Sequence, residues 1–543
     1  MRLFDPHARD YATVYRNFQW DIPTHYNIAT AVCDRHPADK TALYYENQKG
    51  DTATYTFGQL SRWSNQFANA LTALGVARGD RVAIVLPQRV ETGIAHLAVY
   101  KLGGIALPLS VLFGPEALHY RLSDSAAKVI ITDREHYERL AGLRDELPAL
   151  EQLICCDELP GTRQFWSLLE QASDTFKTVA TLADDPALLI YTSGTTGAPK
   201  GALDAHRSLL GNLPGFELSQ NFLPQPHDLM WTPADWAWTG GLLDALLPSW
   251  QYGVPVLAYE GGRFDPERTC DLLARYQVRN AFIPPTALKM LMQVPKLRQR
   301  FDIKLRAIMS AGGTVGEVVL AWGQETLDLT INEMWGQTEF NYLVGNCAPI
   351  MPVKPGAMGR PYPGHVVDVI DEQGTIMPTG EVGEIAARCG DPVMFLGYWN
   401  KPEATADKLT GDWFRTGDTG YRDEDGYLWF VGRNDDVINS AGYRIGPGEI
   451  EDCLLKHPAV RQAAVIGVPD ALRGEAVKAY IVLADGQSGD DALRETIQDE
   501  VKTRLAAYEY PRHIEFIDEL PLTTTGKVRR TELRRRHQDS TES

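Results

Sequence analysis

The sequence lacks the features that mark extracellular, membrane and disulfide-stapled proteins. Its 543 residues include only seven cysteines, an odd number with no framework spacing, which favours free thiols in a reducing compartment. The longest apolar stretch, residues 93–109, is interrupted by His96 and Lys101 and is shorter than the roughly 20 residues that a membrane span needs. Residues 1–15 are charged and aromatic, without the apolar core of a signal peptide. We therefore expect a soluble, cytoplasmic protein.

Positive charge is also in deficit. Lys and Arg number 53 against 71 Asp and Glu, which gives a formal net charge of -18. Nucleic acid and anionic lipid offer such a surface no counter-charge, so we expect neither as a main partner. The exception is an arginine-rich stretch near the C-terminus, which is typical of one solvated face of a terminal helix. Its members are Arg529, Arg530, Arg534, Arg535 and Arg536.

Length and pattern predict an α/β protein of at least two domains. A chain of 543 residues is too long for one hydrophobic core. Thr56 and Gln59 form a capping box that begins a helix ending near residue 74. β-rich runs at 81–86, 128–132 and 187–191 alternate with helical stretches, which is typical of parallel sheets flanked by helices.

The texture changes near Gly432, where aromatic strand material meets a break rich in Gly and Asp. We place a boundary there and predict an N-terminal domain over residues 1–434 and a C-terminal domain over 435–543. The second domain should be small and α+β. Its predicted elements are helices at 447–456 and 493–505 and strands at 463–468, 479–483 and 513–517.

A segment rich in glycine and hydroxyl side chains follows the strand predicted at 187–191. It reads Tyr191-Thr-Ser-Gly-Thr-Thr-Gly-Ala-Pro-Lys-Gly201. Glycines let the backbone approach a ligand, and hydroxyls donate to phosphate oxygens beside the lysine charge. The Walker A pattern fails, because Pro199 replaces its second glycine and Gly201 replaces its Ser or Thr. We predict a triphosphate-binding loop made by Thr192, Ser193, Gly194, Thr195, Thr196 and Lys200.

Further motifs follow this loop in order along the chain. They are Trp335-Gly-Gln-Thr-Glu339, Gly383-Glu384, Gly397-Tyr-Trp399, Trp413-Phe-Arg-Thr-Gly-Asp418, Gly432-Arg-Asn-Asp435, Gly442-Tyr-Arg-Ile-Gly446 and Thr525-Gly-Lys527. With the loop, they resemble the adenylate-forming superfamily of acyl-CoA synthetases, luciferases and peptide-synthetase adenylation domains, over nearly the whole chain. The resemblance implies a large N-terminal domain of stacked α/β subdomains plus a β-barrel-like subdomain. It also implies a small, mobile C-terminal domain that carries a catalytic lysine.

The resemblance implies ATP and Mg²⁺ as cofactors and gives roles to single residues. Glu339 becomes a magnesium ligand, which suits the preference of this ion for hard carboxylate oxygens, and Thr338 lies beside the α-phosphate. Asp418 accepts hydrogen bonds from the ribose hydroxyls, with Arg433 as its companion. Lys527 bridges the carboxylate and the α-phosphate during adenylation. The remaining nucleotide-binding residues are Gly312, Gly313, Glu333, Met334 and Trp335.

The same lysine would block the thiol in the second half-reaction, so the resemblance also implies a rotation of the C-terminal domain. Asp435 is the expected hinge residue. After rotation, Gly442 should lie along the pantetheine tunnel of coenzyme A, and Arg444 and Lys502 should meet its phosphates. Coenzyme A is therefore the expected co-substrate, and no carrier-protein domain follows Lys527 in this sequence.

The acyl pocket is predicted from Ala234-Asp-Trp-Ala-Trp-Thr-Gly-Gly241 and Ser310-Ala-Gly-Gly-Thr314, which resemble acetyl-CoA synthetases. Those enzymes close the pocket with a tryptophan where this chain has Gly336. Removing an indole leaves space for several methylene groups, each worth about 0.8 kcal/mol when buried. The pattern resembles medium-chain acyl-CoA synthetases, which take linear, branched or aryl acids, so acetate should be a poor substrate. The predicted pocket residues are Trp238, Thr239, Gly240, Ala311 and Gly336.

Several alternatives remain open at this point. Trp236, Trp238 and Trp335 could favour an aromatic or sulfonium-bearing acid, since indoles bind flat rings and soft cations. The acceptor could be a separate carrier protein instead of free CoA, and light emission is a third choice. A nucleotide-binding protein without catalysis would have replaced Lys527, Glu339 or Asp418, and all three are present. A homo-oligomer also remains open.

Overall fold

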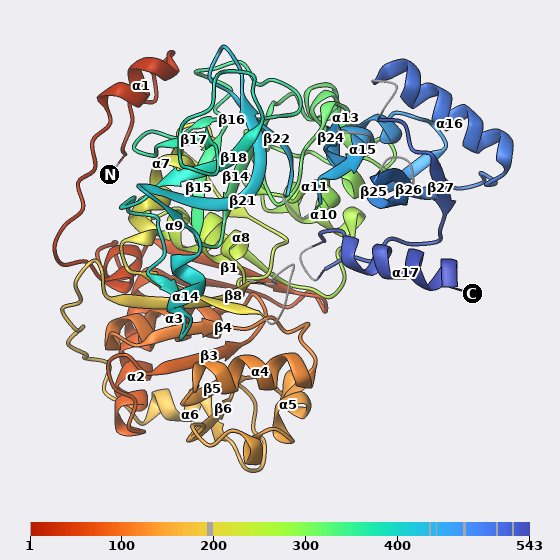
Figure 1. Cartoon of the computed structure of the whole chain (residues 1–543). Helices are drawn as coiled ribbons and strands as arrows, with labels where there is room; N and C mark the ends of the chain where they lie inside the picture. The colour runs from red at the N-terminus through yellow and green to blue at the C-terminus, as the bar shows by residue number, and fades with distance from the viewer. Residues whose placement is uncertain are drawn as a thin grey trace.

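The computed structural model describes residues 2–192, 199–433, 436–440, 443–470, 474–505, 509–523 and 526–542. Two packed α/β layers form the bulk of the chain, and the C-terminal elements lie together at one side (Figure 1). The chain ends lie on opposite sides in that view. This mixed α/β architecture, with a large N-terminal part and a small C-terminal part, confirms the predicted fold class.

The first layer is a largely parallel sheet with helices on both faces. Alternate side chains of its strands point to opposite faces, so Val82 packs with the core under α2 and α3, whereas Ala83 packs with α4 and α5. Its strands are β3 (Arg81–Val85), β4 (Ile105–Pro108), β5 (Val129–Thr132), β6 (Gln152–Cys155), β7 (Arg163–Gln164), β8 (Pro186–Thr192), β9 (Lys200–Ala205) and β19 (Gly397–Tyr398). Its helices are α2 (Phe57–Ala73), α3 (Val90–Leu102), α4 (Pro115–Ser125), α5 (Arg134–Ala141) and α6 (Phe165–Glu170).

The second layer is a longer mixed sheet that lies above the first in Figure 1. Its strands are β1 (Thr41–Asn47), β2 (Thr52–Thr56), β10 (Met230–Trp231), β11 (Val256–Glu260), β12 (Asn280–Phe282), β13 (Ala307–Ser310), β14 (Ile331–Gln337), β15 (Phe340–Gly345), β16 (Ala357–Pro361), β17 (Val367–Ile370), β18 (Gly383–Arg388), β20 (Leu409–Thr410), β21 (Trp413–Arg422) and β22 (Leu428–Arg433). Its central strands β12, β13 and β14 are parallel, and β15 returns antiparallel to β14.

Helical segments from several parts of the chain accompany this second sheet. They are α1 (Tyr11–Asn17), η1 (Thr30–Asp34), α7 (Ser208–Ser219), α8 (Thr239–Gly241), η3 (Leu242–Leu246), α9 (Leu247–Gln251), α10 (Pro266–Arg275), α11 (Pro285–Leu291), α12 (Leu297–Arg300), α13 (Glu317–Trp322) and η4 (Gly323–Leu327). Of these, η1, η3 and η4 are π-helical. Such distortions inside helices are frequent at functional sites. The short helix α14 (Pro402–Ala406) instead contacts β19 of the first sheet.

The expected β-barrel-like subdomain is absent from the described part of the chain. Strands β16, β17, β18, β21 and β22 extend the second sheet instead, because β16 pairs with β15 on one side and with β22 on the other. The order then continues through β21 and β18 to β17, and no described pairing returns from β17 to close a ring. A barrel requires that closure.

The C-terminal elements form a separate small sheet with helices on both faces. Val465 packs with α15 and α16, whereas its neighbour Ile466 packs on the side of Leu533 in α17. The strands are β23 (Ile438–Ser440), β24 (Tyr443–Ile445), β25 (Val460–Asp470), β26 (Gly474–Leu483) and β27 (His513–Phe516). The helices are α15 (Pro447–Leu455), α16 (Asp491–Arg504) and α17 (Arg530–Glu542). The predicted boundary at 434/435 lies outside the described residues.

The arginine-rich stretch is only partly a solvated face, because Arg529, Arg535 and Arg536 are exposed as predicted, whereas Arg530 and Arg534 form ion pairs within the domain. Arg534 pairs with Asp436 at 2.7 Å, and Arg530 pairs with Glu451 of α15 at 2.6 Å. These two ion pairs connect the last helix to the start of the small domain. Their side chains are mostly buried, and hydrogen bonds between opposite charges are stronger than neutral ones. Two arginines of the basic stretch thus pair with carboxylates of the same domain.

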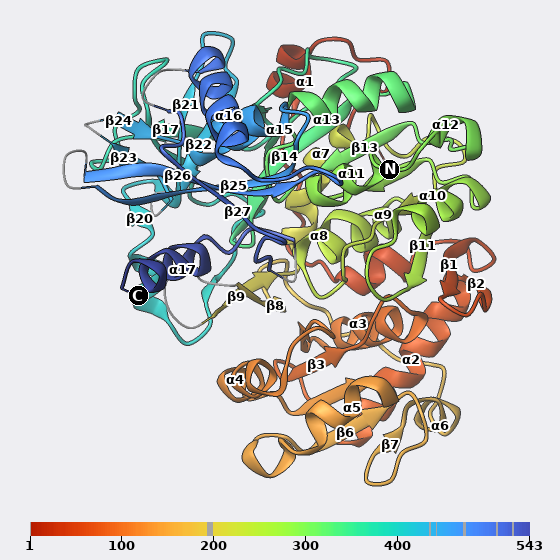
Figure 2. The ribbon, with the colours of Figure 1, turned by 90° about the vertical axis from the view of Figure 1, so that its right-hand side faces the viewer.

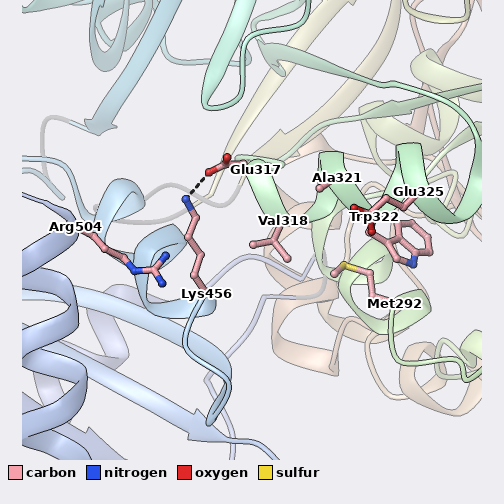
Figure 3. A pocket seen from close by; sticks show the side chains of 8 residues that line it. All are labelled: Met292, Glu317, Val318, Ala321, Trp322, Glu325, Lys456 and Arg504. Carbon is pink, nitrogen blue, oxygen red and sulfur yellow. Dashed lines mark hydrogen bonds and ion pairs between the residues drawn. The ribbon is translucent and has the colours of Figure 1, made fainter.

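The two domains meet along α13 and α15 (Figure 2). Lys456 contacts Glu317 across the interface at 2.5 Å, beside a cavity of about 550 Å³ with apolar walls from Met292, Val318 and Trp322 (Figure 3). Gly316, with φ +77°, leaves room for the carboxylate of Asp452, since an added Cβ would lie 2.1 Å from Oδ1. The domains are therefore in direct contact in this structure.

The cysteines and the apolar helices of the structure agree with the expectations from the sequence. All seven cysteines are free thiols in the structure. Within the described residues, no helix combines the length and apolar character needed to cross a bilayer.

Candidate active site

The predicted triphosphate loop joins two paired strands at the edge of the first sheet. Thr192 ends β8, Lys200 begins β9, and the Thr192 hydroxyl donates to the Lys200 carbonyl at 3.3 Å. The Lys200 ammonium lies 5.1 Å from the ring centre of Tyr398. Ser193, Gly194, Thr195 and Thr196 lie outside the described residues. The structure therefore gives the frame of the loop, the antiparallel strands β8 and β9 on either side of it.

Asp418 lies at the centre of a dense polar cluster. It is in register with Arg433 on the neighbouring strand, and the Arg433 Nε lies 3.4 Å from its Oδ1. Its Oδ2 accepts from Gln337 at 2.9 Å and from the indole N–H of Trp335 at 3.1 Å. Burial raises the pKa of Asp418, while Arg433, Gln337 and Trp335 oppose that rise. The cluster holds a carboxylate ready to accept hydrogen bonds from a ligand.

Glu339 lies in the turn between β14 and β15. The Tyr398 hydroxyl donates to its Oε1, and its backbone carbonyl accepts from Phe395 N at 3.0 Å. No described residue hydrogen-bonds the second carboxylate oxygen. A single carboxylate with one oxygen available fits Mg²⁺, which is usually bound through one or two carboxylates together with substrate phosphates. When bound, the ion would neutralise phosphate charge. Thr338 occupies the same turn.

Lys527 reaches from the small domain into the large one. Its Cε would lie 3.6 Å from a Cβ on Gly312, and a Cβ on the preceding Gly526 would meet Thr286 at 2.8 Å. Lys527 as a whole is exposed, whereas protein groups surround its ammonium end. This local loss of water lowers the pKa of the ammonium and Arg433 adds to the lowering, whereas Asp418 and Glu339 oppose it. The lysine thus shares one electrostatic cluster with three other predicted site residues.

The predicted nucleotide-binding glycines leave an open surface beside Lys527. Gly312 has φ +93° and, like Gly313, is exposed; a Cβ on Gly313 would meet only Pro285, at 3.9 Å. Glu333, by contrast, is buried and accepts from the backbone N–H of Val315 at 3.1 Å, and burial raises its pKa to about 8. Met334 belongs to the core. Glu333 therefore holds the backbone just after Gly312 and Gly313, and neither Glu333 nor Met334 is exposed at the surface.

We call residues 234–241, from which the acyl pocket is predicted, the acyl segment; its last three residues form α8. Trp238 is half-buried and packs edge-on against Phe113, with ring centres 5.6 Å apart. Gly240 faces Phe282, because a Cβ at this position would lie 2.5 Å from the ring. The volume gained by glycine at position 240 is thus taken by Phe282. Ala311 lies at the end of β13, and Thr239 is half-buried at the start of α8.

Gly336 has a backbone reason to be glycine. An added Cβ would lie 2.8 Å from the amide nitrogen of Tyr342 and 2.9 Å from the carbonyl oxygen of Phe340. The register of β14 and β15 also shifts at this point. Its predicted role at the acyl pocket therefore stays a prediction, and the strand pairing alone accounts for the absence of a side chain.

A polar framework supports the acyl segment from behind. Asp235 accepts from Ser110 at 2.8 Å and from Ala237 N at 3.0 Å, which fixes the turn before Trp238. Gln88 donates to the carbonyls of Thr232 and Ala234 at 3.1 and 2.7 Å. The segment is therefore anchored to loops that follow β3 and β4.

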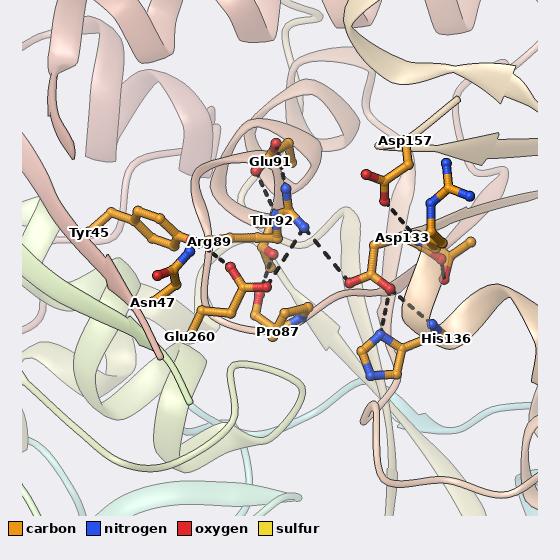
Figure 4. Close-up of polar contacts among 12 residues, drawn as sticks. Tyr45, Asn47, Pro87, Arg89, Glu91, Thr92, Asp133, His136, Asp157 and Glu260 are labelled. Carbon is orange, nitrogen blue, oxygen red and sulfur yellow. Dashed lines mark hydrogen bonds and ion pairs between the residues drawn. The ribbon is translucent and has the colours of Figure 1, made fainter. Parts of the chain in front are cut away.

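Arg89 forms the centre of the neighbouring ion network (Figure 4). Its guanidinium donates twice to Glu91, at 2.8 and 2.9 Å, and lies 3.8 Å from Asp133 and 3.9 Å from Glu260. His136 contacts Asp133 at 2.6 Å. These groups join the carboxyl ends of β3, β5 and β11, so they hold the two sheets together beneath the site.

Several predicted residues are not brought to this cluster. Lys502 lies on α16, paired with Asp499 at 3.0 Å and placed 4.4 Å from the Tyr510 ring centre. Asp435, Gly442 and the side chain of Arg444 lie outside the described residues. Trp236 is fully buried in the core, so it does not face a ligand. Trp335 donates its indole N–H to Asp418, so it lies with the predicted nucleotide-binding residues.

Sequence reasoning missed Tyr398, Gln337 and Phe113 as site residues. The first two stand inside the motifs Gly397-Tyr-Trp399 and Trp335-Gly-Gln-Thr-Glu339, so their position was the available signal. Phe113 carries no motif, and only its contact with Trp238 reveals it.

Comparisons with known proteins agree with this geometry. The family model of the AMP-binding enzyme matches residues 29–399, and that of the AMP-binding enzyme C-terminal domain matches 449–527. The mitochondrial acyl-coenzyme A synthetase ACSM3 of Rattus norvegicus is 37% identical over 562 residues, covering 98% of this chain and 94% of that protein.

Solved structures give the same result. The anthranilate CoA ligase AuaEII in complex with anthranoyl-AMP superposes with a TM-score of 0.89 at 30% identity, over 96% of this chain and 99% of that one. A benzoate CoA ligase from Burkholderia xenovorans LB400 gives 0.84 at 28% identity, over 94% and 100%. The chain therefore belongs to the AMP-binding enzyme family, matching its adenylate-forming, ATP-dependent CoA ligases over nearly its full length.

Proposed function

We propose that the chain is an ATP-dependent acyl-CoA synthetase that acts on a medium-chain, branched or aryl carboxylic acid rather than acetate. The observation that carries the proposal is the meeting of Lys527, Glu339, Asp418 and Arg433 in one cluster across two domains. Two of the similar solved structures are CoA ligases for aryl acids, anthranilate and benzoate.

In the first half-reaction, a carboxylate oxygen attacks the α-phosphorus of ATP and pyrophosphate leaves. Two anions must approach each other, so the site has to neutralise charge in the transition state. Lys527 would bridge the two reacting groups, Lys200 and the loop hydroxyls would hold the β- and γ-phosphates, and Asp418 would orient the ribose. Glu339 and Thr338 would hold Mg²⁺ and the α-phosphate.

In the second half-reaction, the sulfur of coenzyme A attacks the acyl carbonyl carbon and AMP leaves. In the orientation of this structure, Lys527 lies beside Gly312 at the predicted adenylate site, which would obstruct the thiol. We propose a rotation about Asp435, with Gly442, Arg444 and Lys502 then along the path of CoA. This step requires a domain motion of the kind that hinge residues absorb.

Two features of the acyl segment support a planar or medium-sized acid. Trp238, Phe113 and Phe282 offer three aromatic rings near the start of α8, and aromatic pairs favour flat apolar ligands. Ala311 at the end of β13 is small. The dominance of rings over charged groups at this segment also argues against dicarboxylates.

A substrate panel tests the proposal. The protein should release AMP and pyrophosphate with benzoate, 2-aminobenzoate, hexanoate or 2-methylpropanoate in the presence of ATP, Mg²⁺ and CoA, with acetate poorest. Replacing free CoA with a phosphopantetheinylated carrier protein tests the alternative acceptor. A dominant acetate activity, or thioester formed on the carrier alone, would contradict the proposal.

A further inference from the structure

The structure buries a carboxylate near the acyl segment without a matching cation. Asp244 lies in the π-helical turn η3, is 3% exposed, and its only hydrogen-bond partner among the described residues is the Asn341 amide, which donates to Oδ1. No described lysine or arginine forms an ion pair with it. Burial raises its pKa to about 7. Buried carboxylates normally carry more compensation than one amide, so this one is costly unless it has a use.

The strand order places this pair beside the predicted acyl pocket. β12, β13, β14 and β15 are consecutive neighbours, and their registers put Phe282, Ala311 and Gly336 on the same face of the sheet. The helical segment from Thr239 to Gln251 packs on that face in one common core. Its start touches the sheet at Phe282 through Gly240, and its next turn touches the sheet at Asn341 through Asp244.

The spacing of Gly240 and Asp244 along the helical segment matches the length of a small acid. Gly240 and Asp244 are four residues apart, which corresponds to about 6 Å of helix rise. Ala311 and Gly336 lie on the strands between these two contacts. An acyl group that enters beside Trp238 and extends over Ala311 would therefore direct its far end at Asp244 and Asn341.

Two backbone distortions coincide at the same place. Asp244 stands inside a π-helical turn, and Tyr342, which follows Asn341, has φ 52°, a left-handed conformation in a residue other than glycine. Such distortions persist where surrounding packing enforces them, and they concentrate at ligand sites. Here they bring a carboxylate and an amide to one point of the core.

We propose that Asp244 and Asn341 form the polar far end of the acyl pocket and select a carboxylic acid that carries a hydrogen-bond donor, a hydroxyl or an amine, remote from its carboxylate. The inference rests on the proposed function and names its substrate class. A site built to accept a donor rejects an analogue that lacks it, because the buried acceptor is then left unpaired.

Matched pairs of acids test this selection. Acid-dependent ATP–pyrophosphate exchange is measured for benzoate against 3- and 4-hydroxybenzoate, and for pentanoate against 5-hydroxy- and 5-aminopentanoate. In at least one pair the donor-bearing acid should have a kcat/KM at least about tenfold higher. Asp244→Leu should erase or reverse that ratio, and Asp244→Asn should lower it at least about tenfold, because an amide presents a donor where the carboxylate accepts.

Glu217→Gln is the matched control. Glu217 is equally buried, has its pKa raised by burial to about 7, and faces Tyr252 and the backbone of Leu3 and Phe4. Its substitution should leave the ratio between acids unchanged. The inference is overturned if the parent activates the apolar acid of every pair equally well or better, a result that needs no variant to fold. An unchanged ratio in folded Asp244→Asn also overturns it. Absence of exchange with all acids would instead overturn the proposed function itself.

Discussion

Single residues of this site owe their chemistry to neighbours that are distant in sequence. Lys527 lies 109 positions after Asp418 in the numbering, yet both belong to one electrostatic cluster with Arg433 and Glu339. Trp335 and Gln337 come from a motif of the large domain and both hydrogen-bond Asp418. The role of each residue therefore depends on its neighbours in the cluster, and a substitution of one residue tests the role proposed for it.

Lys527→Ala should abolish adenylate formation and leave thioester formation from a supplied acyl-adenylate largely intact. The lysine contacts the Gly312 side of the site only in the domain orientation of this structure, and it neutralises charge only in the first half-reaction. Pyrophosphate exchange and single-turnover thioesterification measure the two steps separately. Lys304→Ala, an exposed lysine paired with Asp302, is the control for charge removal. Equal loss of both steps in Lys527→Ala would refute the assignment.

Asp244→Asn should stabilise the protein more at pH 8 than at pH 4. The pKa of Asp244 rises from its ordinary 3.8 to about 7 in the folded chain. Between these values the folded chain keeps a proton that the unfolded chain has released, so the free energy of unfolding falls as pH rises through this window. The fall is at most about 1.4 kcal/mol per pH unit, or about 4 kcal/mol in all.

Urea unfolding at pH 4, 6 and 8 measures this difference, and subtracting parent from variant removes the contribution of Glu217 and Glu333, which titrate in both proteins. The gain of the variant over the parent should grow from pH 4 to pH 7 and then level off. A gain independent of pH would show that Asp244 stays ionised throughout.

At the scale of elements, local sequence signals located helices and strands closely. The capping box at Thr56 and Gln59 is formed as predicted, and α2 spans Phe57–Ala73. The strand expected at 128–132 is β5 (Val129–Thr132), and the helix expected at 447–456 is α15 (Pro447–Leu455). Capping residues and short apolar runs act within a few positions, which is why the sequence reveals them. The prediction of a β-barrel-like subdomain was wrong, because closure of a barrel depends on pairing between edge strands that are far apart in the sequence.

Gly336→Ala should destabilise the fold, although a smaller-to-larger change in a pocket would ordinarily be mild. The new Cβ would meet the backbone of Tyr342 and Phe340 at 2.8 and 2.9 Å, and backbone cannot move aside as a side chain can. We expect the free energy of unfolding to fall by about 1–3 kcal/mol. Gly313→Ala is the matched control, since its Cβ would have 3.9 Å to the nearest atom. Equal stability of the two variants would restore the simpler view that Gly336 only provides pocket space.

At the scale of the whole molecule, the proposed mechanism makes the relation between the two domains decide which half-reaction proceeds. Contacts across the interface include Lys456 with Glu317, Asp452 against Gly316, and Gly526 against Thr286. Glu317 and Lys456 line the cavity of Figure 3, and Gly526 directly precedes Lys527. All of these contacts would be lost if the small domain rotated.

Glu317→Gln should favour thioesterification over adenylation, because it removes one charged contact of the adenylation orientation. The Glu317 side chain is 61% exposed, so the shift in the ratio of the two half-reaction rates should stay below about fivefold. The same ratio should rise with salt in the parent and respond less in the variant. Combining Glu317→Lys with Lys456→Glu should restore the parent ratio. If it does not, the pair is a passive surface contact.

The sequence by itself determined the reaction class and most elements of the fold. Glycines, hydroxyls and a lysine in one loop indicate phosphate binding, the ordered motifs indicate the reaction class through their resemblance to a known family, and short-range patterns indicate where helices and strands form. The surroundings of the site were decided by tertiary structure alone. Phe282 fills the space beside Gly240, Phe113 packs on Trp238, and Asn341 meets Asp244, each through contacts between segments that the sequence separates. Such contacts depend on strand order and register, and neither is encoded within one motif, because packing of the whole sheet selects them.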